Sequence, residues 1–298
     1  MRSINYTISK EYNNRPLLHF LKDELKLSTH IVQSLRHTNG AVLINGNFAR
    51  VVDIVSEGDT LEITFPEKTQ PPLLWEKELE IIFEDQDLLV INKPSGISVH
   101  PTFNHPNGTL CNAVANYLLK TQNTHAAARA IGRLDKVTSG VLIFAKNAYT
   151  ASRLNGSIEK IYNAIAYGCT PEKGTIDAPI YRPDLGKTMR AVGEEGDKAI
   201  THFKTIMSSK EKSFLEITTE TGRTHQIRVH MAHIGHPLMG DEMYGAPITV
   251  NLKRAALHCN TVTIIHPVTK EEITFTAPLP EDMKNELNTF CVLSEDNQ

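Results

Sequence analysis

Apolar residues recur at helical spacing early in the chain and at strand spacing after that. Between Pro16 and Leu25 they fall on one helical face. Ser28 is a candidate N-cap for a second short helix, which should end near Asn39-Gly40, a turn signal. Strands are predicted at 41–44, 51–55 and 60–64. The section to about residue 70 therefore predicts two small helices followed by short strands.

The rest of the chain is rich in strand patterns and poor in helical ones. Pro66, Pro71 and Pro72 mark a linker. Beyond it, helices are predicted only at 110–119 and 148–154, whereas strands are predicted at 79–83, 88–92, 140–145, 162–167, 201–207, 214–219, 261–265 and 273–277. This balance favours an α+β fold around a mixed, mostly antiparallel sheet. The predicted boundaries are 1–70, a linker at 71–78, a main domain at 79–285 and a C-terminal tail at 286–298.

Composition is that of a globular protein and excludes several classes. The 298 residues are 40% hydrophobic and 22% charged, which excludes disordered, collagen-like and coiled-coil chains. Apolar runs are far shorter than the ~20 residues of a membrane span, and the N-terminus lacks an apolar signal core. The four cysteines form no Cys-x-x-Cys pair. We therefore expect a reduced, cytoplasmic protein without a membrane.

The charge balance is slightly acidic, with a net charge of −3 and a pI near 6.5. That excludes a strongly basic, non-specific nucleic-acid binder but allows a local basic patch. Lys22, Lys26, Arg36 and Arg50 lie on or beside the predicted N-terminal helices. They form either a small RNA-docking face or an ordinary solvated surface.

The densest polar cluster is Ile131-Gly-Arg-Leu-Asp-Lys-Val-Thr-Ser-Gly140, directly before an apolar strand. It brings together Arg133, Asp135, Lys136 and Thr138. Asp135 is either a catalytic carboxylate kept ionised by nearby cations or one of the polar residues that turns favour in any case.

A second cluster, Thr221-Gly-Arg-Thr-His-Gln-Ile-Arg-Val-His230, carries two arginines and two histidines. If this segment is a strand, Gln226, Arg228 and His230 share one face, while Ile227 and Val229 share the other. The polar face would present cations and amides to phosphate, carboxylate or base edges. The alternative is an exposed polar strand face without a ligand.

Metal and cofactor chemistry has little support in the sequence. His225, His230, His233 and His236 lack a metal-ligand spacing such as His-Glu-x-x-His, although a His-ligated hydrolase stays a remote alternative. Phosphate-loop, nucleophile-elbow and dinucleotide motifs do not occur in the chain. We therefore expect neither a metal nor a cofactor.

Together the clusters resemble the RluA-type pseudouridine synthases from about residue 80 to 282. The resemblance is carried by an ordered series of motifs: Leu88–Pro101, Arg133-Leu-Asp135 with Thr138-Ser-Gly140, Lys160-Ile-Tyr162, Gly222–His230, Gly235-His-Pro237, Gly240-Asp241, Leu257-His258, His266-Pro267 and Ala277–Pro280. More loosely, the first 70 residues resemble a small RNA-binding domain also found in a ribosomal small-subunit protein.

This resemblance implies an RNA pseudouridine synthase that flips a uridine out of structured RNA, with ribosomal RNA favoured over transfer RNA. Asp135 would be the catalytic aspartate, Arg228 its ionic partner, and Tyr162 the residue that stacks on the uracil and assists proton removal. The implied substrate-binding residues are Arg133, which would fill the gap left by the flipped base, Val229, which would pack near the base, and Arg223, His225, Gln226, Lys136 and Thr138. A monomer is expected.

The sequence departs from the family pattern at two places. Gly132 stands where the family usually has histidine, and the segment at 148–159 is shorter than usual. These departures keep a second hypothesis open, that of an inactive RNA-binding or ribosome-assembly protein.

Overall fold

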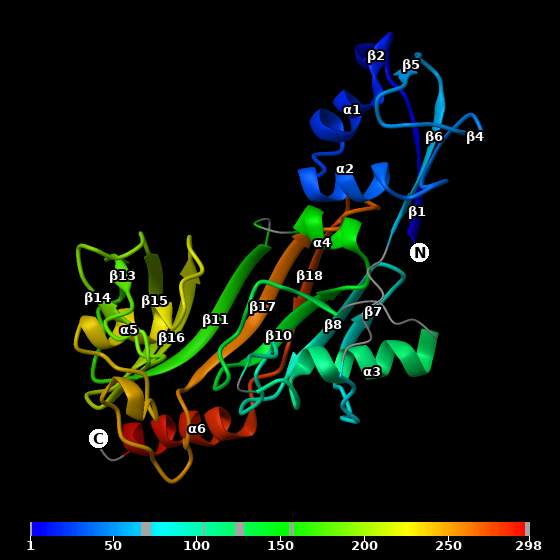
Figure 1. Cartoon of the computed structure of the whole chain (residues 1–298). Coiled ribbons are helices and arrows are strands. Elements are labelled where there is room, and N and C mark those ends of the chain that lie inside the picture. The colour runs from blue at the N-terminus through cyan, green and yellow to red at the C-terminus, as the bar shows by residue number, and fades with distance from the viewer. Residues whose placement is uncertain are drawn as a thin grey trace.

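A computed structural model describes residues 2–66, 73–103, 105–122, 128–154, 156 and 158–295. Figure 1 shows a small N-terminal unit set beside a larger body, through which one long, strongly twisted sheet runs. Within the described ranges, no helix is long and apolar enough to cross a membrane.

The N-terminal unit combines a small sheet with short helices. Its sheet has the order β1 (Arg2–Thr7), β6 (Thr60–Phe65), β3 (Val42–Ile44) and β4 (Asn47–Phe48). The other elements are η1 (Lys10–Tyr12), β2 (Arg15–Pro16) paired with β5 (Ile54–Val55), α1 (Leu17–His19), which continues as η2 (Phe20–Glu24), and α2 (Thr29–Arg36). Both predicted helices are confirmed. The Ser28 cap is confirmed too, because its Oγ accepts the Ile31 N–H at 3.3 Å.

Two N-terminal elements differ from the prediction. Strand β1 was not predicted, because its burial alternates weakly and its place comes from full-length pairing with the distant strand β6. The predicted strand at 51–55 is reduced to Ile54–Val55. Asp53 explains this, since its carboxylate accepts the Arg50 backbone N–H at 2.8 Å and closes a local turn that competes with extended structure.

The main body is built on a ten-stranded sheet, and the α+β prediction is confirmed. Its order is β12 (Lys173–Asp177), β15 (Ile200–Ser208), β16 (Lys212–Thr219), β11 (Ile158–Tyr167), β17 (Leu257–Ile265), β10 (Ser139–Ala145), β8 (Leu88–Lys93) and β7 (Ile81–Glu84). In addition, β18 (Glu272–Thr276) pairs with β17, and β9 (Arg129–Ile131) pairs with β10. All neighbours are antiparallel except β10 and β17, which run parallel.

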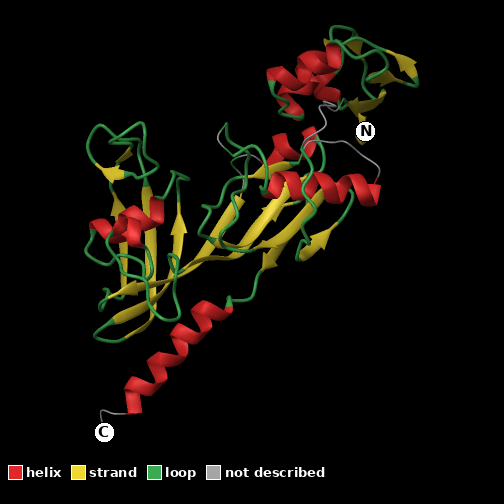
Figure 2. Ribbon diagram, turned by 60° about the horizontal axis from the view of Figure 1, so that its bottom comes forward, coloured by secondary structure: helices red, strands yellow, loops and turns green. Residues whose placement is uncertain are grey.

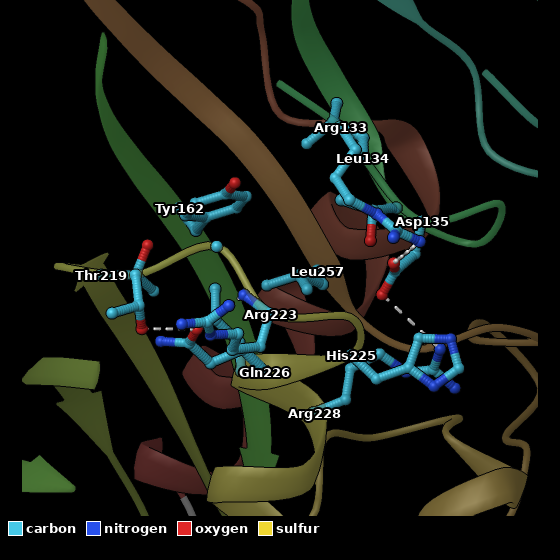
Figure 3. Close-up of a pocket in the computed structure, with 14 residues that line it drawn as sticks. Arg133, Leu134, Asp135, Tyr162, Thr219, Arg223, His225, Gln226, Arg228 and Leu257 are labelled. Atoms are coloured by element: carbon cyan, nitrogen blue, oxygen red, sulfur yellow. Dashed lines mark hydrogen bonds and ion pairs between the residues drawn. The ribbon is translucent and has the colours of Figure 1, made fainter. Parts of the chain in front are cut away.

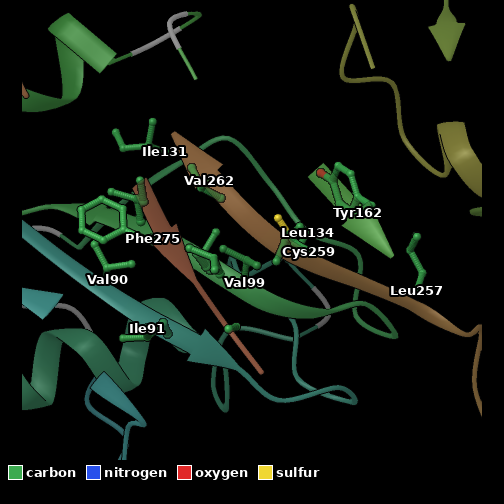
Figure 4. Packing of buried hydrophobic residues seen from close by; sticks show 14 of the residues in the cluster. Val90, Ile91, Val99, Ile131, Leu134, Tyr162, Leu257, Cys259, Val262 and Phe275 are labelled. Carbon is green, nitrogen blue, oxygen red and sulfur yellow. The ribbon is translucent and has the colours of Figure 1, made fainter. Parts of the chain in front are cut away.

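Helices cover this sheet and add a second layer. The helix α3 (Leu110–Gln122) packs Leu110, Val114 and Leu118 into the main core, and Figure 2 shows it lying along the sheet. All seven residues of β10 are buried. Figure 4 shows the same core from close by, with Val90, Ile91 and Phe275 packed around it. The loop that precedes β10 is therefore anchored to the most buried strand of the body.

The helix α6 (Glu281–Glu295) begins before residue 286, where the sequence predicts the start of a tail. Its anchor is a buried ion pair, in which the Lys212 ammonium lies 2.6 Å from a Glu286 carboxylate oxygen. Met283 is also fully buried. Because these partners come from β16, far away in the sequence, local pattern alone did not indicate the helix.

The N-terminal unit is joined to the body through α4 (Ala148–Leu154). Tyr149 of this helix belongs to the core of the N-terminal unit and packs against Phe65, with 4.9 Å between ring centroids. Its hydroxyl accepts a hydrogen bond from Tyr6 at 3.1 Å. Arg2 adds an ion pair to the buried Asp87 at 3.0 Å. The segment that the sequence predicts to be shorter than the family pattern thus includes the helix that docks the N-terminal unit.

Candidate active site

The two polar clusters of the sequence meet in one pocket. Its walls are the loop before β10, Tyr162 on β11, the segment after β16 and the start of α5 (Gln226–His233). Figure 3 shows Asp135, Tyr162, Arg223 and Arg228 turned toward a common space. The structure therefore brings together residues that lie up to about a third of the chain apart.

Asp135 reaches the pocket from a tight turn. The Thr138 N–H donates to the Asp135 carbonyl at 3.1 Å, and the buried Leu134 anchors the preceding residue in the core. The Asp135 carboxylate is 13% exposed. Its two oxygens face one cation each, Arg133 at 3.9 Å and Arg228 at 3.8 Å. At these distances the carboxylate is flanked by charge but not locked in short hydrogen bonds.

A buried lysine under this turn was not singled out from the sequence. The Lys93 ammonium donates to the carbonyl oxygens of Pro94, Lys136 and Thr138, at 2.9, 3.2 and 2.7 Å. Burial and the nearby Arg254 lower the pKa of Lys93 to about 7, against the opposing effect of Asp135. Lys93 thus fixes the backbone of the loop, whereas the side chain of Lys136 points to solvent and that of Thr138 is buried.

The strand considered for residues 226–230 does not form, because these residues open helix α5. Six consecutive residues from Gln226 to Met231 are buried, so the helix has no polar face to produce a helical period in the sequence. The alternation of polar and apolar residues imitated a strand. His225 precedes the helix in the left-handed region, at φ 58°. The shared face predicted for Gln226, Arg228 and His230 does not exist.

The helix separates residues that a strand would have grouped. The Gln226 amide is occupied by the fold: it donates to Ile200 O at 2.9 Å and accepts the Arg223 backbone N–H at 2.9 Å. Val229 packs against Ile180 and Ala199, away from the pocket. The geometry assigns both to the scaffold around the pocket, and only Gln226 also contributes to its wall.

Arg228 has a stronger partner than the one predicted. Its Nε and Nη2 donate to the two carboxylate oxygens of Asp241, at 2.7 and 2.6 Å, and its guanidinium lies 5.1 Å from the centre of the Tyr244 ring. Asp135 is the looser partner, at 3.8 Å. Asp241 was quoted only as part of a motif, since nothing in the sequence indicates that it faces Arg228 across 13 residues.

Tyr162 forms the apolar wall of the pocket. It is 8% exposed and lies at a bulge in the pairing of β11 with β17, opposite Cys259. Burial, together with the neighbouring Cys259 and Asp135, raises the pKa of Tyr162 well above its usual value. The phenol is therefore neutral near pH 7, and its ring gives the pocket that it shares with Asp135 a flat apolar surface.

His225 is held by η3 (Glu242–Tyr244). Its Nδ1 is hydrogen-bonded to the Tyr244 hydroxyl at 2.9 Å, and that hydroxyl accepts the Arg190 backbone N–H at 3.0 Å. Burial and the neighbouring cations Arg228 and Arg190 lower the pKa of His225 to about 4, although Asp135 and Asp241 oppose the shift. The imidazole is therefore neutral in the folded protein above that pH.

Two arginines stand at the mouth of the pocket. Arg133 is 54% exposed and donates to the Thr224 hydroxyl at 2.9 Å. Arg223 donates to the Lys198 carbonyl at 3.1 Å and lies 3.4 Å from Asp197. Both cations face solvent beside the Asp135 carboxylate, where an anionic polymer can reach them.

The four histidines considered as metal ligands do not converge. His230 is hydrogen-bonded to Thr201 and Ala178, both at 2.9 Å, and His236 to the Tyr167 carbonyl at 2.9 Å. Across the part of the chain that the structure describes, no three His, Cys, Asp or Glu side chains are grouped as metal ligands.

Comparisons with known proteins agree with the fold. Residues 87–233 match the RNA pseudouridylate synthase family. The uncharacterized RNA pseudouridine synthase YhcT of Bacillus subtilis is 39% identical, covering 97% of this chain and 98% of its own. Ribosomal large subunit pseudouridine synthase D of Pseudomonas aeruginosa is 36% identical, covering 82% of each chain. The solved structure of human RNA pseudouridylate synthase domain containing 4 has a TM-score of 0.58 at 25% identity, covering 70% of this chain and 92% of that one.

The mostly antiparallel sheet, together with these matches, defines an RNA-modifying isomerase of the pseudouridine synthase class. The chain belongs to the RNA pseudouridine synthase family, as the resemblance implied. Its enzyme class is RNA pseudouridine synthase.

Proposed function

We propose that this enzyme converts specific uridines of ribosomal RNA to pseudouridine, with Asp135 as the catalytic aspartate. One observation carries the proposal: the Asp135 carboxylate faces the pocket between Tyr162 and Arg228, and none of the described residues holds it in a short hydrogen bond. A carboxylate in this setting is free to act on a ribose or a base.

The chemistry balances without a cofactor. The bond between the base nitrogen N1 and the ribose C1′ breaks, the base turns, and a bond forms between C5 and C1′. The proton on C5 leaves, and N1 gains a proton. Atoms and oxidation state are unchanged overall, so the protein has to provide a reactive carboxylate, a pocket for the turning base and a proton acceptor.

Each of the other two pocket residues suits one of these needs. The Tyr162 ring offers a flat surface on which the uracil can stack while it turns. Its hydroxyl would assist removal of the C5 proton. Arg228, pinned by Asp241, holds a positive charge 3.8 Å from Asp135 and would orient the carboxylate.

The target uridine has to leave its stack before it can enter the pocket. Extrusion of a base costs about a few kcal/mol. Arg133 is exposed at the mouth, and its planar guanidinium could replace the lost stacking. Arg223, also at the mouth, would contact the phosphates nearby.

Ribosomal RNA is proposed because several relatives are named ribosomal large subunit pseudouridine synthase D. We assign RNA docking to the N-terminal unit, where Arg36 and Arg50 line an open groove with the exposed Phe48. Cations beside an exposed aromatic ring suit an RNA backbone with an unpaired base.

Mass-spectrometric mapping of pseudouridine in total RNA, with and without the gene, tests the substrate. The expected result is the loss of one or a few ribosomal sites, restored by the wild-type gene but not by Asp135→Asn. Loss confined to transfer RNA would overturn the proposed substrate and leave the enzyme class intact.

Tritium release from RNA labelled at C5 of uridine tests the mechanism. Asp135→Asn should release no tritium above background while still binding the RNA, because the amide keeps the size of the carboxylate but cannot act as a nucleophile. Wild-type rates in this variant would refute the role of Asp135. If the wild-type protein binds RNA but releases no tritium from any mapped substrate, the chain is an RNA-binding protein without activity.

A further inference from the structure

Lys160 has no role in the mechanism above, yet it lies inside the catalytic region. It stands on β11, two residues before Tyr162. Side chains at this spacing project from the same face of a strand. Cys259, on the neighbouring strand β17, interacts electrostatically with both of them. The Lys160 ammonium is thus a neighbour of the pocket wall that Tyr162 forms.

The catalytic loop leaves room for this ammonium at Gly132. This residue adopts φ +70°, and a Cβ built on it would lie 3.0 Å from Lys160 Nζ. Gly132 directly precedes Arg133, and both are exposed. The Lys160 ammonium therefore lies against the same loop that carries Arg133 and Asp135, beside the exposed Gly132.

Lys160 differs from Lys93 and Lys212, the buried lysines of the main body, because the described residues offer it no hydrogen-bond acceptor or carboxylate. Lys93 donates to three carbonyl oxygens, and Lys212 is paired with Glu286. Burial lowers the pKa of Lys160, with only the Cys259 thiol opposing the shift. A half-buried ammonium without an anion is costly, and an anion supplied from outside removes that cost.

We propose that Lys160 binds a phosphate of the RNA backbone next to the target uridine. The proposal rests on the proposed function, because it takes RNA as the ligand. RNA presents one phosphate per nucleotide, and the exposed Arg133 directly follows Gly132, the residue that the Lys160 ammonium approaches. A phosphate held by Lys160 would fix the backbone on one side of the flipped nucleotide while the base lies on Tyr162.

The test uses binding rather than turnover. The RNA is a transcript centred on the uridine mapped above, or an all-uridine single strand if no site is mapped. Affinity is measured for Asp135→Asn alone and combined with Lys160→Met, across a salt series. The Lys160→Met change should weaken binding about tenfold at low salt. It should also reduce the slope of log affinity against log salt by about 0.7–0.9, the value of one phosphate contact.

Methylphosphonate substitution then identifies the phosphate. Neutralising the contacted phosphate should weaken binding when Lys160 is present and have no further effect in Lys160→Met. Lys160→Arg should keep much of the affinity, because the charge remains. Lys204, an exposed lysine on β15 that does not line the pocket, provides the matched control as Lys204→Met, which should leave affinity near wild type.

Thermal denaturation separates effects on folding from effects on binding. The affinity of a variant is interpreted only if its melting temperature is close to that of the parent protein. Unchanged affinity and salt slope in Lys160→Met would overturn the proposal. So would a slower reaction at saturating RNA with an altered pH profile and unchanged affinity, because that result assigns Lys160 to proton transfer. Either outcome leaves the tritium result for wild type and Asp135→Asn, and hence the proposed function, unaffected.

Discussion

Arg228 lies between two carboxylates, and the balance between them is the most informative point to perturb. Asp241 accepts two short hydrogen bonds from the guanidinium, at 2.6 and 2.7 Å, whereas Asp135 stays at 3.8 Å. We predict that Asp241→Asn both destabilises the protein and slows catalysis. The substitution preserves shape, so its effects report on charge and hydrogen bonding.

The loss of stability follows from the geometry. An asparagine can still accept one of the two guanidinium N–H groups, but its amide NH₂ opposes the other. One charge-assisted hydrogen bond is lost, at about 1.5–3 kcal/mol, and the buried cation loses its closest counter-charge. Breaking such a buried pair outright costs about 3–5 kcal/mol. We therefore expect about 2–4 kcal/mol, equivalent to a fall in Tm of about 5–10 °C.

The effect on catalysis follows from the new position of the Arg228 guanidinium in Asp241→Asn. Without the Asp241 charge, Asp135 is the remaining carboxylate that the described residues place near Arg228, and the loose contact should tighten into a direct ion pair. A carboxylate held that way is a weaker nucleophile and points away from the substrate. We expect the rate at saturating RNA to fall about ten- to a hundredfold, or about 1.4–2.8 kcal/mol in the barrier.

Thermal denaturation and single-turnover tritium release measure these two effects separately. Glu242→Gln is the matched control, because Glu242 is the exposed neighbour of Asp241 and should change stability by less than about 0.5 kcal/mol. If Asp241→Asn melts with the wild type and reacts at its rate, the assignment of Asp241 as the residue that positions Arg228 is refuted.

Two further predictions concern the strand and the lysine that support the catalytic loop. Gly140 has φ +114°, and a Cβ there would lie 2.1 Å from the Cys259 carbonyl oxygen. Gly140→Ala should therefore lower the free energy of unfolding by more than about 4 kcal/mol or prevent folding. The control Gly222→Ala, in open space, should lower it by about 0.5 kcal/mol or less, and urea unfolding measures both. Lys93 has a folded-state pKa of about 7, below its unfolded value near 10.5, so the unfolded chain binds more protons between these values and stability should rise with pH above 7. Between pH 7 and 9 the rise in the free energy of unfolding should be larger in wild type than in Lys93→Met. If urea unfolding gives the same dependence on pH for both proteins, the prediction is contradicted.

Much of the site could be found in the sequence because its residues are contiguous in motifs. Arg133 and Asp135 lie shortly before the apolar strand β10, Tyr162 lies within β11, and the pocket does gather them. The strands of the body were predicted for the same reason, since β8 and β10 are apolar along nearly their whole length. The local sequence pattern is sufficient to predict a strand where its residues are buried along nearly their whole length.

The tertiary structure decided what local pattern leaves ambiguous. Residues Gln226 to Met231 form a helix that is buried on all sides. In this helix the surrounding protein satisfies polar side chains such as Gln226, which a strand would have exposed. Asp241 is the first partner of Arg228, and Lys93 supports the catalytic loop, because residues distant in sequence meet only when the sheet closes. The sequence by itself predicted the fold class and the enzyme family, and it singled out Asp135 as the carboxylate that we propose to be reactive. Which cation faces which carboxylate depends on distances of a few ångströms, and only the packing of the strands and helices sets those.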